Sequence, residues 1–298
     1  MYATPFAAGD SDELWRVERM ISTYKSIWQE DQAGNYVRTQ RGSYPLEFIS
    51  HVIPQVGRLT GLRNLLGRKA QGVDYYRYYS DIILSGDRGK WANESGRVLA
   101  QLSSLGIETQ GKKALDISGE PGFFGKDMSA ICDITVTAFA DNVAQAMADH
   151  HKIAAVKYDY QSDQLTSIFK NGFDVAFNRY SIGFCIDLDS HLQDLSGVMT
   201  NGGIFYLTFS PASRAVCARW MFDDYTYLRQ YTEKHVVAAA AKAGFKLLGQ
   251  FDEGSFRWDS DLHPIQQLLS KRYLSSRFFK HDEKEKWQRN VALVFRLG

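Results

Sequence analysis

The stretch Lys113-Ala-Leu-Asp-Ile-Ser-Gly-Glu-Pro-Gly-Phe-Phe-Gly125 decides the fold of this 298-residue chain. A short apolar run carries one acid, Asp116, near its end, and a turn rich in glycine and proline leads into an apolar helix start. This order is typical of a β-strand that enters a tight loop at the positive end of a helix, where nucleotide-like ligands bind. Because Asp116 would repel a pyrophosphate, the loop favours a ligand with positive charge.

Short apolar runs alternate with helical stretches from about residue 110 onward, which is the pattern of an α/β domain with a parallel sheet. The expected strands are 113–117, 134–139, 154–158, 173–177, 204–209, 245–251 and 291–295. One helix is expected to start near residue 125. Three others are expected over residues 142–151, 190–198 and 232–242. No helix is evident between the last two strands. The sequence therefore predicts a doubly wound, mostly parallel seven-stranded sheet with a terminal antiparallel hairpin.

The first 90 residues have a different pattern. Leu14, Val17, Ile21, Tyr24 and Trp28 recur at three- and four-residue spacing, which predicts a helix with one apolar face. Further apolar runs at helical spacing follow as far as residue 84. We therefore expect two regions, a helical lid or substrate region over residues 1–90 and a ligand-binding domain over residues 91–298.

Composition excludes several classes of protein. The 35 basic side chains nearly balance the 34 acidic ones, so neither a nucleic acid nor an anionic membrane is an expected partner. No segment reaches the roughly 20 apolar residues of a membrane span, and the N-terminus lacks the features of a signal peptide. The three cysteines, Cys132, Cys185 and Cys217, form no CxxC pair, so neither a disulfide framework nor a metal site is indicated. A cytoplasmic protein with reduced thiols is expected.

Ligands of a doubly wound sheet bind at the carboxyl ends of its strands, and four such ends can be identified. The first end is the loop already quoted, whose candidate binding residues are Asp116, Ser118, Gly119, Glu120 and Gly122.

The second and third ends carry acids that suit an adenosyl group. Phe139 occupies the position of an acid that would accept hydrogen bonds from ribose hydroxyls, and Asp141 follows it slightly late. Asp141 fits equally well as a residue that caps the next helix. At the third end, Asp159 could accept a hydrogen bond from an adenine amino group and Tyr160 could stack on the ring. The fourth end places Asn178, Arg179 and Tyr180 at the same edge of the sheet.

Together the four ends resemble the class I S-adenosylmethionine-dependent methyltransferases of the small-molecule type, over roughly residues 95–298. The matching segments are Leu115-Asp-Ile-Ser-Gly-Glu-Pro-Gly122, Tyr158-Asp159, Phe173-Asp-Val-Ala-Phe-Asn-Arg179, Leu195-Ser-Gly-Val-Met-Thr-Asn-Gly-Gly-Ile204 and Ala243-Gly-Phe245. The resemblance implies a Rossmann-like fold and S-adenosylmethionine as the cofactor. It also implies methyl transfer to a hydroxyl or amine of a small molecule, in a biosynthetic or sugar-tailoring pathway.

The chain departs from the family pattern at the glycine loop and after the fourth strand. Ser118 stands at the position of the family's first glycine, Glu120 at that of the second, and Gly183 where one O-methyltransferase subgroup has a histidine base. A hydroxyl acceptor needs a base, whereas a neutral amine can react without one. The candidate bases are His191, His235 and Tyr180, although a tyrosine with a pKa of about 10 is a poor base.

Two other functions are open alternatives. The altered loop is also compatible with a non-catalytic member of the fold that acts as a binding or scaffold protein. A nicotinamide-dependent oxidoreductase is disfavoured, because Gly119-x-x-Gly122-x-x-Gly125 lacks the G-x-G-x-x-G spacing. The sequence leaves the oligomeric state open, with a homodimer as one alternative.

Overall fold

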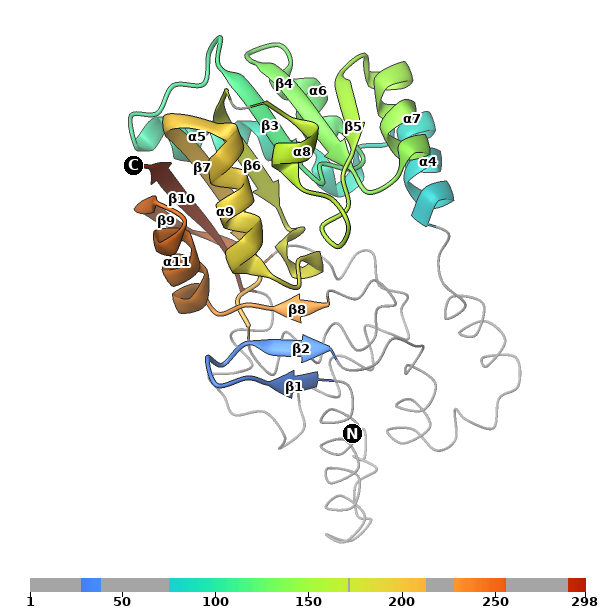
Figure 1. The fold of residues 1–298 in the computed structure, drawn as a ribbon. Helices are drawn as coiled ribbons and strands as arrows, with labels where there is room; N and C mark the ends of the chain where they lie inside the picture. The colour runs from blue at the N-terminus through green and yellow to red at the C-terminus, as the bar shows by residue number, and fades with distance from the viewer. Residues whose placement is uncertain (1–27, 39–74, 171, 213–227, 256–288) are drawn as a thin grey trace, which may run out of the picture.

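The computed structural model describes residues 28–38, 75–170, 172–212, 228–255 and 289–298. Its main sheet has the strand order β5-β4-β3-β6-β7-β10-β9 (Figure 1). The strands are β3 (Lys113–Ile117), β4 (Asp133–Ala138), β5 (Ala154–Lys157), β6 (Phe173–Arg179), β7 (Met199–Phe209), β9 (Phe245–Ser255) and β10 (Arg289–Leu297). Strands β3 to β7 are parallel, and β10 lies antiparallel between β7 and β9. The predicted sheet and its terminal hairpin are confirmed.

Helices cover both faces of this sheet, as the doubly wound architecture requires. One face carries α4 (Tyr75–Ser85), α5 (Glu94–Ser104), α6 (Phe123–Met128) and α7 (Asp141–His151), and the other carries α8 (Leu165–Ile168), α9 (Leu188–Val198) and α11 (Glu233–Lys242). Two short 3₁₀ helices, η2 (Gly89–Trp91) and η3 (Ile182–Phe184), connect larger elements. Each face buries its own apolar cluster, one around Leu192 and Phe205 and the other around Phe124 and Val143. Strands buried on both faces explain the nearly continuous apolar runs in the sequence.

A second, three-stranded sheet lies at the carboxyl ends of the main strands, with the order β1-β2-β8. Its strands are β1 (Trp28–Glu30), β2 (Tyr36–Arg38) and β8 (Arg229–Gln230). The sequence analysis did not predict this sheet, and the expectation that Trp28 ends a helix is wrong because Trp28 begins β1. A buried side chain fixes the sheet to the start of α11, since Asn35 Oδ1 accepts a hydrogen bond of 2.9 Å from the Thr232 N–H.

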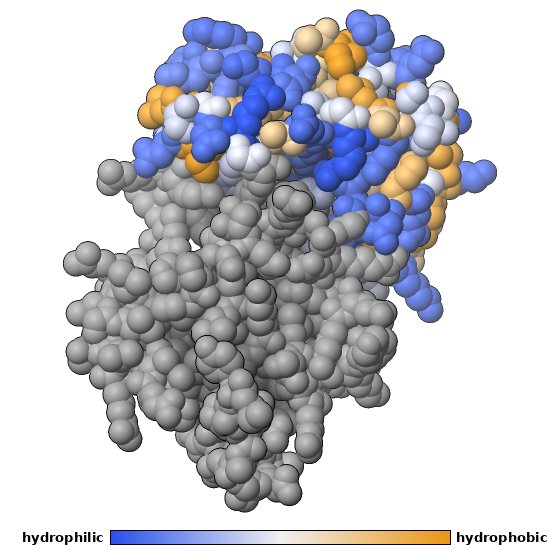
Figure 2. Space-filling model, turned by 180° about the vertical axis from the view of Figure 1, so that it is seen from behind, coloured by the Kyte–Doolittle hydropathy of each residue, from blue (hydrophilic) through white to orange (hydrophobic). Residues whose placement is uncertain are grey.

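The predicted N-terminal helices and most of the predicted lid lie outside the described residues. Within residues 1–90, α4 packs against α7 of the sheet domain, and the rings of Tyr79 and Phe139 meet edge-on with centroids 6.1 Å apart. The boundary near residue 90 stays a prediction. Seen from behind, the described surface carries hydrophilic and hydrophobic residues side by side (Figure 2). Among the described helices, none combines the length and the apolar character of a bilayer-crossing segment.

Candidate functional site

The loop after β3 lies directly against the end of β4. The N–H of Ser118 donates to Thr137 Oγ1 at 2.8 Å, and the N–H of Gly119 donates to Thr137 O at 3.0 Å. Ser118 has a φ of 50°, in the left-handed region where glycine is the usual residue. A Cβ on Gly119 would overlap with the carboxylate of Asp116, so only glycine allows this approach. The backbone of the loop therefore packs directly against the carboxylate of Asp116.

Asp116 is paired with an arginine from the neighbouring strand. Arg179 donates to Asp116 through Nε at 3.2 Å and Nη2 at 2.9 Å, and to Glu94 through Nη1 at 2.5 Å. The guanidinium also lies over the ring of Phe124, 4.0 Å from its centroid. We call Glu94, Asp116 and Arg179 the acid–arginine cluster. Asp116 is therefore already paired with a positive charge in the free protein, and its role toward a cationic ligand stays a prediction.

Burial dominates the electrostatics of the cluster. The side chains of Asp116, Arg179 and Glu94 are 0%, 6% and 7% exposed. Burial raises the pKa of Asp116 and of Glu94, and the charge of Arg179 acts in the opposite direction. Burial alone would lower the pKa of Arg179, but the two carboxylates outweigh it and raise that pKa. The two carboxyl groups therefore depend on Arg179 to remain charged.

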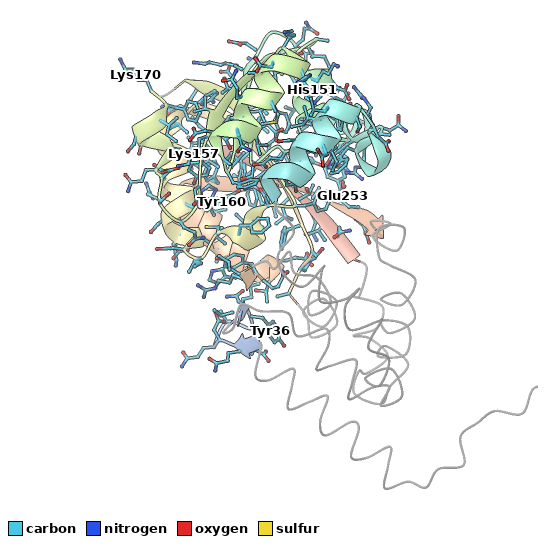
Figure 3. The ribbon with its side chains drawn as sticks, turned by 90° about the vertical axis from the view of Figure 1, so that its right-hand side faces the viewer. Tyr36, His151, Lys157, Tyr160, Lys170 and Glu253 are labelled. Atoms are coloured by element: carbon cyan, nitrogen blue, oxygen red, sulfur yellow. The ribbon has the colours of Figure 1, made fainter. Side chains whose placement is uncertain are left out.

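Helix α5 extends the cluster into a wider polar network. Arg97 lies one turn after Glu94 and approaches Glu253 of β9 at 2.9 Å. The Tyr180 hydroxyl donates to Glu253 at 3.2 Å, and Gln101 donates to it at 2.6 Å. Figure 3 shows Glu253 and Tyr160 toward the same end of the sheet domain, the end that faces Tyr36 of the small sheet. The network therefore lies at the carboxyl ends of the parallel strands, where the fold predicts a ligand.

The sequence analysis did not identify Glu94, Arg97 or Glu253 as site residues. Glu94, Arg97 and Gln101 recur at three- and four-residue spacing on α5. This pattern is equally typical of a helix face exposed to solvent. Glu253 belongs to a strand more than 150 residues away in the chain. No local motif marks this set, because it is assembled by the fold.

Glu120 brings a carboxyl group to Phe139, the position where the sequence analysis looked for a ribose-binding acid. Its Oε1 accepts a hydrogen bond of 2.7 Å from the N–H of Phe139, the residue that follows β4. Burial raises the pKa of Glu120 to about 7. Asp141 is exposed in the first turn of α7, where its charge suits the helix dipole, although Ala140 is the N-cap residue; its role toward a ribose stays a prediction.

The third and fourth strand ends are joined by a small polar group of residues. Asn178 donates to the Tyr160 hydroxyl at 2.8 Å, and this hydroxyl also bonds Ser181 at 2.9 Å. The ring of Tyr160 packs edge-on against His191, with centroids 4.9 Å apart. Asp159 accepts a hydrogen bond of 2.9 Å from the Gln161 N–H within its own turn. Stacking of Tyr160 and hydrogen bonding of Asp159 to an adenine stay predictions.

The three candidate bases have separate surroundings. His191 is buried and bonds the Tyr158 hydroxyl at 3.0 Å, and burial lowers its pKa to about 4. His235 lies in the first turn of α11 with its ring stacked on Tyr231, 5.5 Å between centroids. Burial raises the pKa of Tyr180, which makes its phenol a weaker acid and disfavours the phenolate that a base needs. The identity of the base stays a prediction.

Comparison with known proteins identifies the fold. No protein-family model matches the chain, and no curated protein sequence matches it. A putative methyltransferase from Bacillus halodurans superimposes with a TM-score of 0.53 at 12% identity, over 66% of this chain and 97% of that chain. The YcgJ protein of Bacillus subtilis gives a TM-score of 0.53 at 9% identity, over 68% and 98% of the two chains.

A third match extends the comparison to another organism. A chain of the complex between the Haloferax volcanii Trm112 methyltransferase activator and a putative methyltransferase gives a TM-score of 0.51 at 10% identity. The match covers 73% of this chain and 96% of that chain. The protein therefore has the fold of the class I methyltransferases, as the sequence predicts.

Proposed function

We propose that this protein is an S-adenosylmethionine-dependent methyltransferase that acts on a small molecule. The observation that carries the proposal is the position of the Gly119 loop and the acid–arginine cluster, at the carboxyl ends of a sheet with the methyltransferase fold. Ligands of doubly wound sheets bind at this edge. The fold alone does not define an activity, so the proposal depends on these side chains.

The charges in the site fit the methionine end of S-adenosylmethionine better than a lone carboxylate would. That end carries both an ammonium and a carboxylate. The network holds three carboxyl groups, those of Glu94, Asp116 and Glu253, and two guanidinium groups, those of Arg97 and Arg179. When all five groups are ionised, the network has a net charge of −1. It therefore offers both carboxylates for an ammonium and guanidinium groups for a carboxylate.

Arg179 would hold the carboxylate of the cofactor, and the cluster acids or Glu120 would hold its ammonium. When bound, the cofactor supplies an electrophilic methyl group on a sulfonium sulfur. The chain's own contribution is to align the acceptor with that methyl group and to keep water away. Gly119 lets the backbone of the loop lie close to Asp116, where a side chain would not fit. Buried charges in a fixed network favour a fixed orientation of the ligand.

The acceptor in this proposal is a hydroxyl or an amine of a small molecule in a biosynthetic or sugar-tailoring pathway. The near-neutral net charge of +1 supports a small acceptor rather than a nucleic acid. A cytoplasmic location and a homodimer belong to the same proposal and need their own measurements.

Calorimetric titration with S-adenosylmethionine and S-adenosylhomocysteine tests the proposal. We expect both to bind, and we expect Asp159→Ala to weaken binding by about 1–3 kcal/mol through loss of a buried hydrogen bond. Asp149→Ala, which removes an exposed acid of α7, is the matched control and should leave binding unchanged. If neither compound binds at millimolar concentration, the proposed function is wrong.

A non-catalytic binding protein is the second candidate function. The pairing of Asp116 with Arg179 supports it, because a satisfied ion pair can be retained as structure alone. A binding protein would bind S-adenosylmethionine, or another ligand, without releasing S-adenosylhomocysteine in the presence of any acceptor. Release of S-adenosylhomocysteine during incubation with a panel of small hydroxyl and amine compounds would exclude this candidate.

A further inference from the structure

Glu120 delivers its carboxyl group to a neighbouring strand rather than to its own loop. It belongs to the loop after β3, but its Oε1 accepts a hydrogen bond of 2.7 Å from the N–H of Phe139, the first residue after β4. Strands β3 and β4 are parallel neighbours, with Asp116 beside Val136. The carboxyl group therefore lies at the carboxyl end of β4, where the chain itself has the apolar side chain of Phe139.

The end of β4 has a defined role in doubly wound folds. An acid placed there, roughly 20 residues after the glycine turn that follows the first strand, accepts a hydrogen bond from a ribose hydroxyl. Phe139 stands at that distance from Gly119 and has no acceptor on its side chain. The loop after β3 thus supplies, through Glu120, the carboxyl group that this position lacks.

The carboxyl group of Glu120 has unused hydrogen-bonding capacity. The donors that face it among the described residues are backbone N–H groups, that of Phe139 and its own. Arg179, whose charge also acts on Glu120, forms its ion pairs with Asp116 and Glu94 instead. A carboxylate accepts about four hydrogen bonds. Two further donors fit, which is the number that the 2′- and 3′-hydroxyls of a ribose bring.

The strand ends around Glu120 are open to a ligand. Glu120 is partly exposed, whereas Asp116 of the acid–arginine cluster is 0% exposed. Partly exposed residues continue along the same edge after β3, β4 and β5, namely Ser118, Phe139 and Asp159. The last residues of β3 and β4, Ile117 and Ala138, are buried. Exposure therefore begins at the strand ends and forms a strip across three neighbouring strands.

The order of the strands separates Glu120 from the ammonium of S-adenosylmethionine. In the proposed binding mode Arg179, at the end of β6, holds the cofactor's carboxylate, and the ammonium is attached to the same carbon atom. Strand β3 lies between β6 and β4, so the end of β4 is two strands from Arg179, about 10 Å at the usual spacing of strands. Asp116 and Glu94 contact Arg179 directly and are the acids placed for the ammonium. Glu120 is placed for the sugar.

We propose that Glu120 binds the 2′- and 3′-hydroxyls of a ribose, and that the ligand at this edge is a nucleoside or nucleoside derivative with an unmodified diol. A phosphate on either hydroxyl would bring like charges together, so phosphorylated riboses are excluded. The identity of the nucleoside derivative as S-adenosylmethionine rests on the proposed function. The recognition of the diol rests on Glu120.

Three adenosine compounds test the proposal on the full chain at about pH 8, above the raised pKa of Glu120, which is about 7. Adenosine carries both hydroxyls, 2′,3′-dideoxyadenosine carries neither, and adenosine 2′-monophosphate replaces one of them by an anion. In ligand-observed NMR titrations adenosine should bind about tenfold more tightly than either of the others, the usual effect of one hydrogen bond to a charged group. Equal affinity of adenosine and either other compound, or no binding of adenosine at millimolar concentration, would overturn the proposal.

Glu120→Gln keeps an oxygen for the Phe139 N–H and removes the charge. It should weaken adenosine about tenfold, leave dideoxyadenosine unchanged and strengthen adenosine 2′-monophosphate. A merely structural role of Glu120 would move all three affinities in the same direction, and that result would refute the assignment. Glu108→Gln, the same change at an exposed residue in the loop before β3, is the control and should alter none of them.

Asp141 is the rival acid, because it is exposed in the first turn of α7, just after β4. Asp141→Asn should retain the preference for adenosine over dideoxyadenosine. Loss of the preference in this variant, with its retention in Glu120→Gln, would assign the ribose to Asp141 and contradict the proposal.

Titration with S-adenosylhomocysteine separates this proposal from the proposed function. If S-adenosylhomocysteine binds with the same affinity to the wild type and to Glu120→Gln, the role of Glu120 is wrong and the methyltransferase function is unaffected. If adenosine shows the preference that depends on Glu120 while S-adenosylmethionine does not bind, only the methyltransferase function is wrong.

Discussion

Replacement of Arg179 by methionine should destabilise the protein strongly, because it leaves two buried carboxyl groups without their positive partner. The guanidinium is 6% exposed and bonds Asp116 at 2.9 Å and Glu94 at 2.5 Å. Removing one partner of a buried ion pair costs about 3–5 kcal/mol. Two acids share this arginine, so we expect the upper part of that range at neutral pH.

The destabilisation should depend on pH in a defined direction. Without Arg179, the folded-state pKa values of Asp116 and Glu94 rise further, because burial then acts without compensation. A group whose folded pKa is raised contributes stability below its unfolded pKa and loses it as the pH rises through the folded pKa. The Arg179→Met variant should therefore regain stability relative to the wild type as the pH is lowered.

Urea unfolding followed by circular dichroism measures both effects. Arg88→Met is the matched control, because Arg88 pairs with Asp127 at 2.7 Å near the surface, with side chains 38% and 25% exposed. A pair of this kind is worth at most about 1 kcal/mol. The double variant Arg179→Met with Asp116→Asn should recover part of the loss. Equal losses for Arg179→Met and Arg88→Met, or a loss independent of pH, would refute the cluster as an interdependent buried unit.

Two further predictions concern the loop after β3. Gly119→Ala should weaken binding of S-adenosylhomocysteine and lower the melting temperature, because the new Cβ would overlap with the Asp116 carboxylate; an unchanged melting temperature would show that the loop can move away. Glu120→Gln keeps an oxygen for the Phe139 N–H but cannot ionise. Because the pKa of Glu120 is raised from 4.5 to about 7, the wild type should lose stability relative to this variant as the pH rises from about 4.5 to about 7, and parallel melting curves at all pH values would contradict this.

The main sheet could be predicted from the sequence because its signals are local. Strand β3 runs over Lys113–Ile117, as expected, and the predicted helix over residues 142–151 begins at Asp141. Buried parallel strands separated by helices leave a pattern that any window of the chain contains. By contrast, β1, β2 and β8 have two or three residues each, too few to show an alternation. The pairing of Val37 with Arg229 joins segments almost 200 residues apart.

The candidate site shows the same division between local and distant signals. The sequence correctly brought Asp116 and Arg179 to one edge, because both follow from the ends of neighbouring parallel strands. It could not show that they pair with each other, since both were expected to face the ligand. Nor could it place the Glu120 side chain, which reaches from its own loop to the end of β4. Strand ends are predictable from pattern, whereas the partners of charged side chains depend on the packed structure.

The acid–arginine cluster is itself an argument for a binding site rather than a structural device. Helix α5 already packs on the sheet through Val98 and Leu102, both 0% exposed, so its attachment does not require charges. Apolar residues of similar size in place of a buried ion pair are often equally or more stabilising. The polar residues of α5 nevertheless contact the carboxyl ends of the strands, and Glu94 and Asp116 depend on Arg179 to stay charged. A fold that gains little stability from this cluster is expected to keep it for a ligand, and a zwitterionic ligand matches its charges.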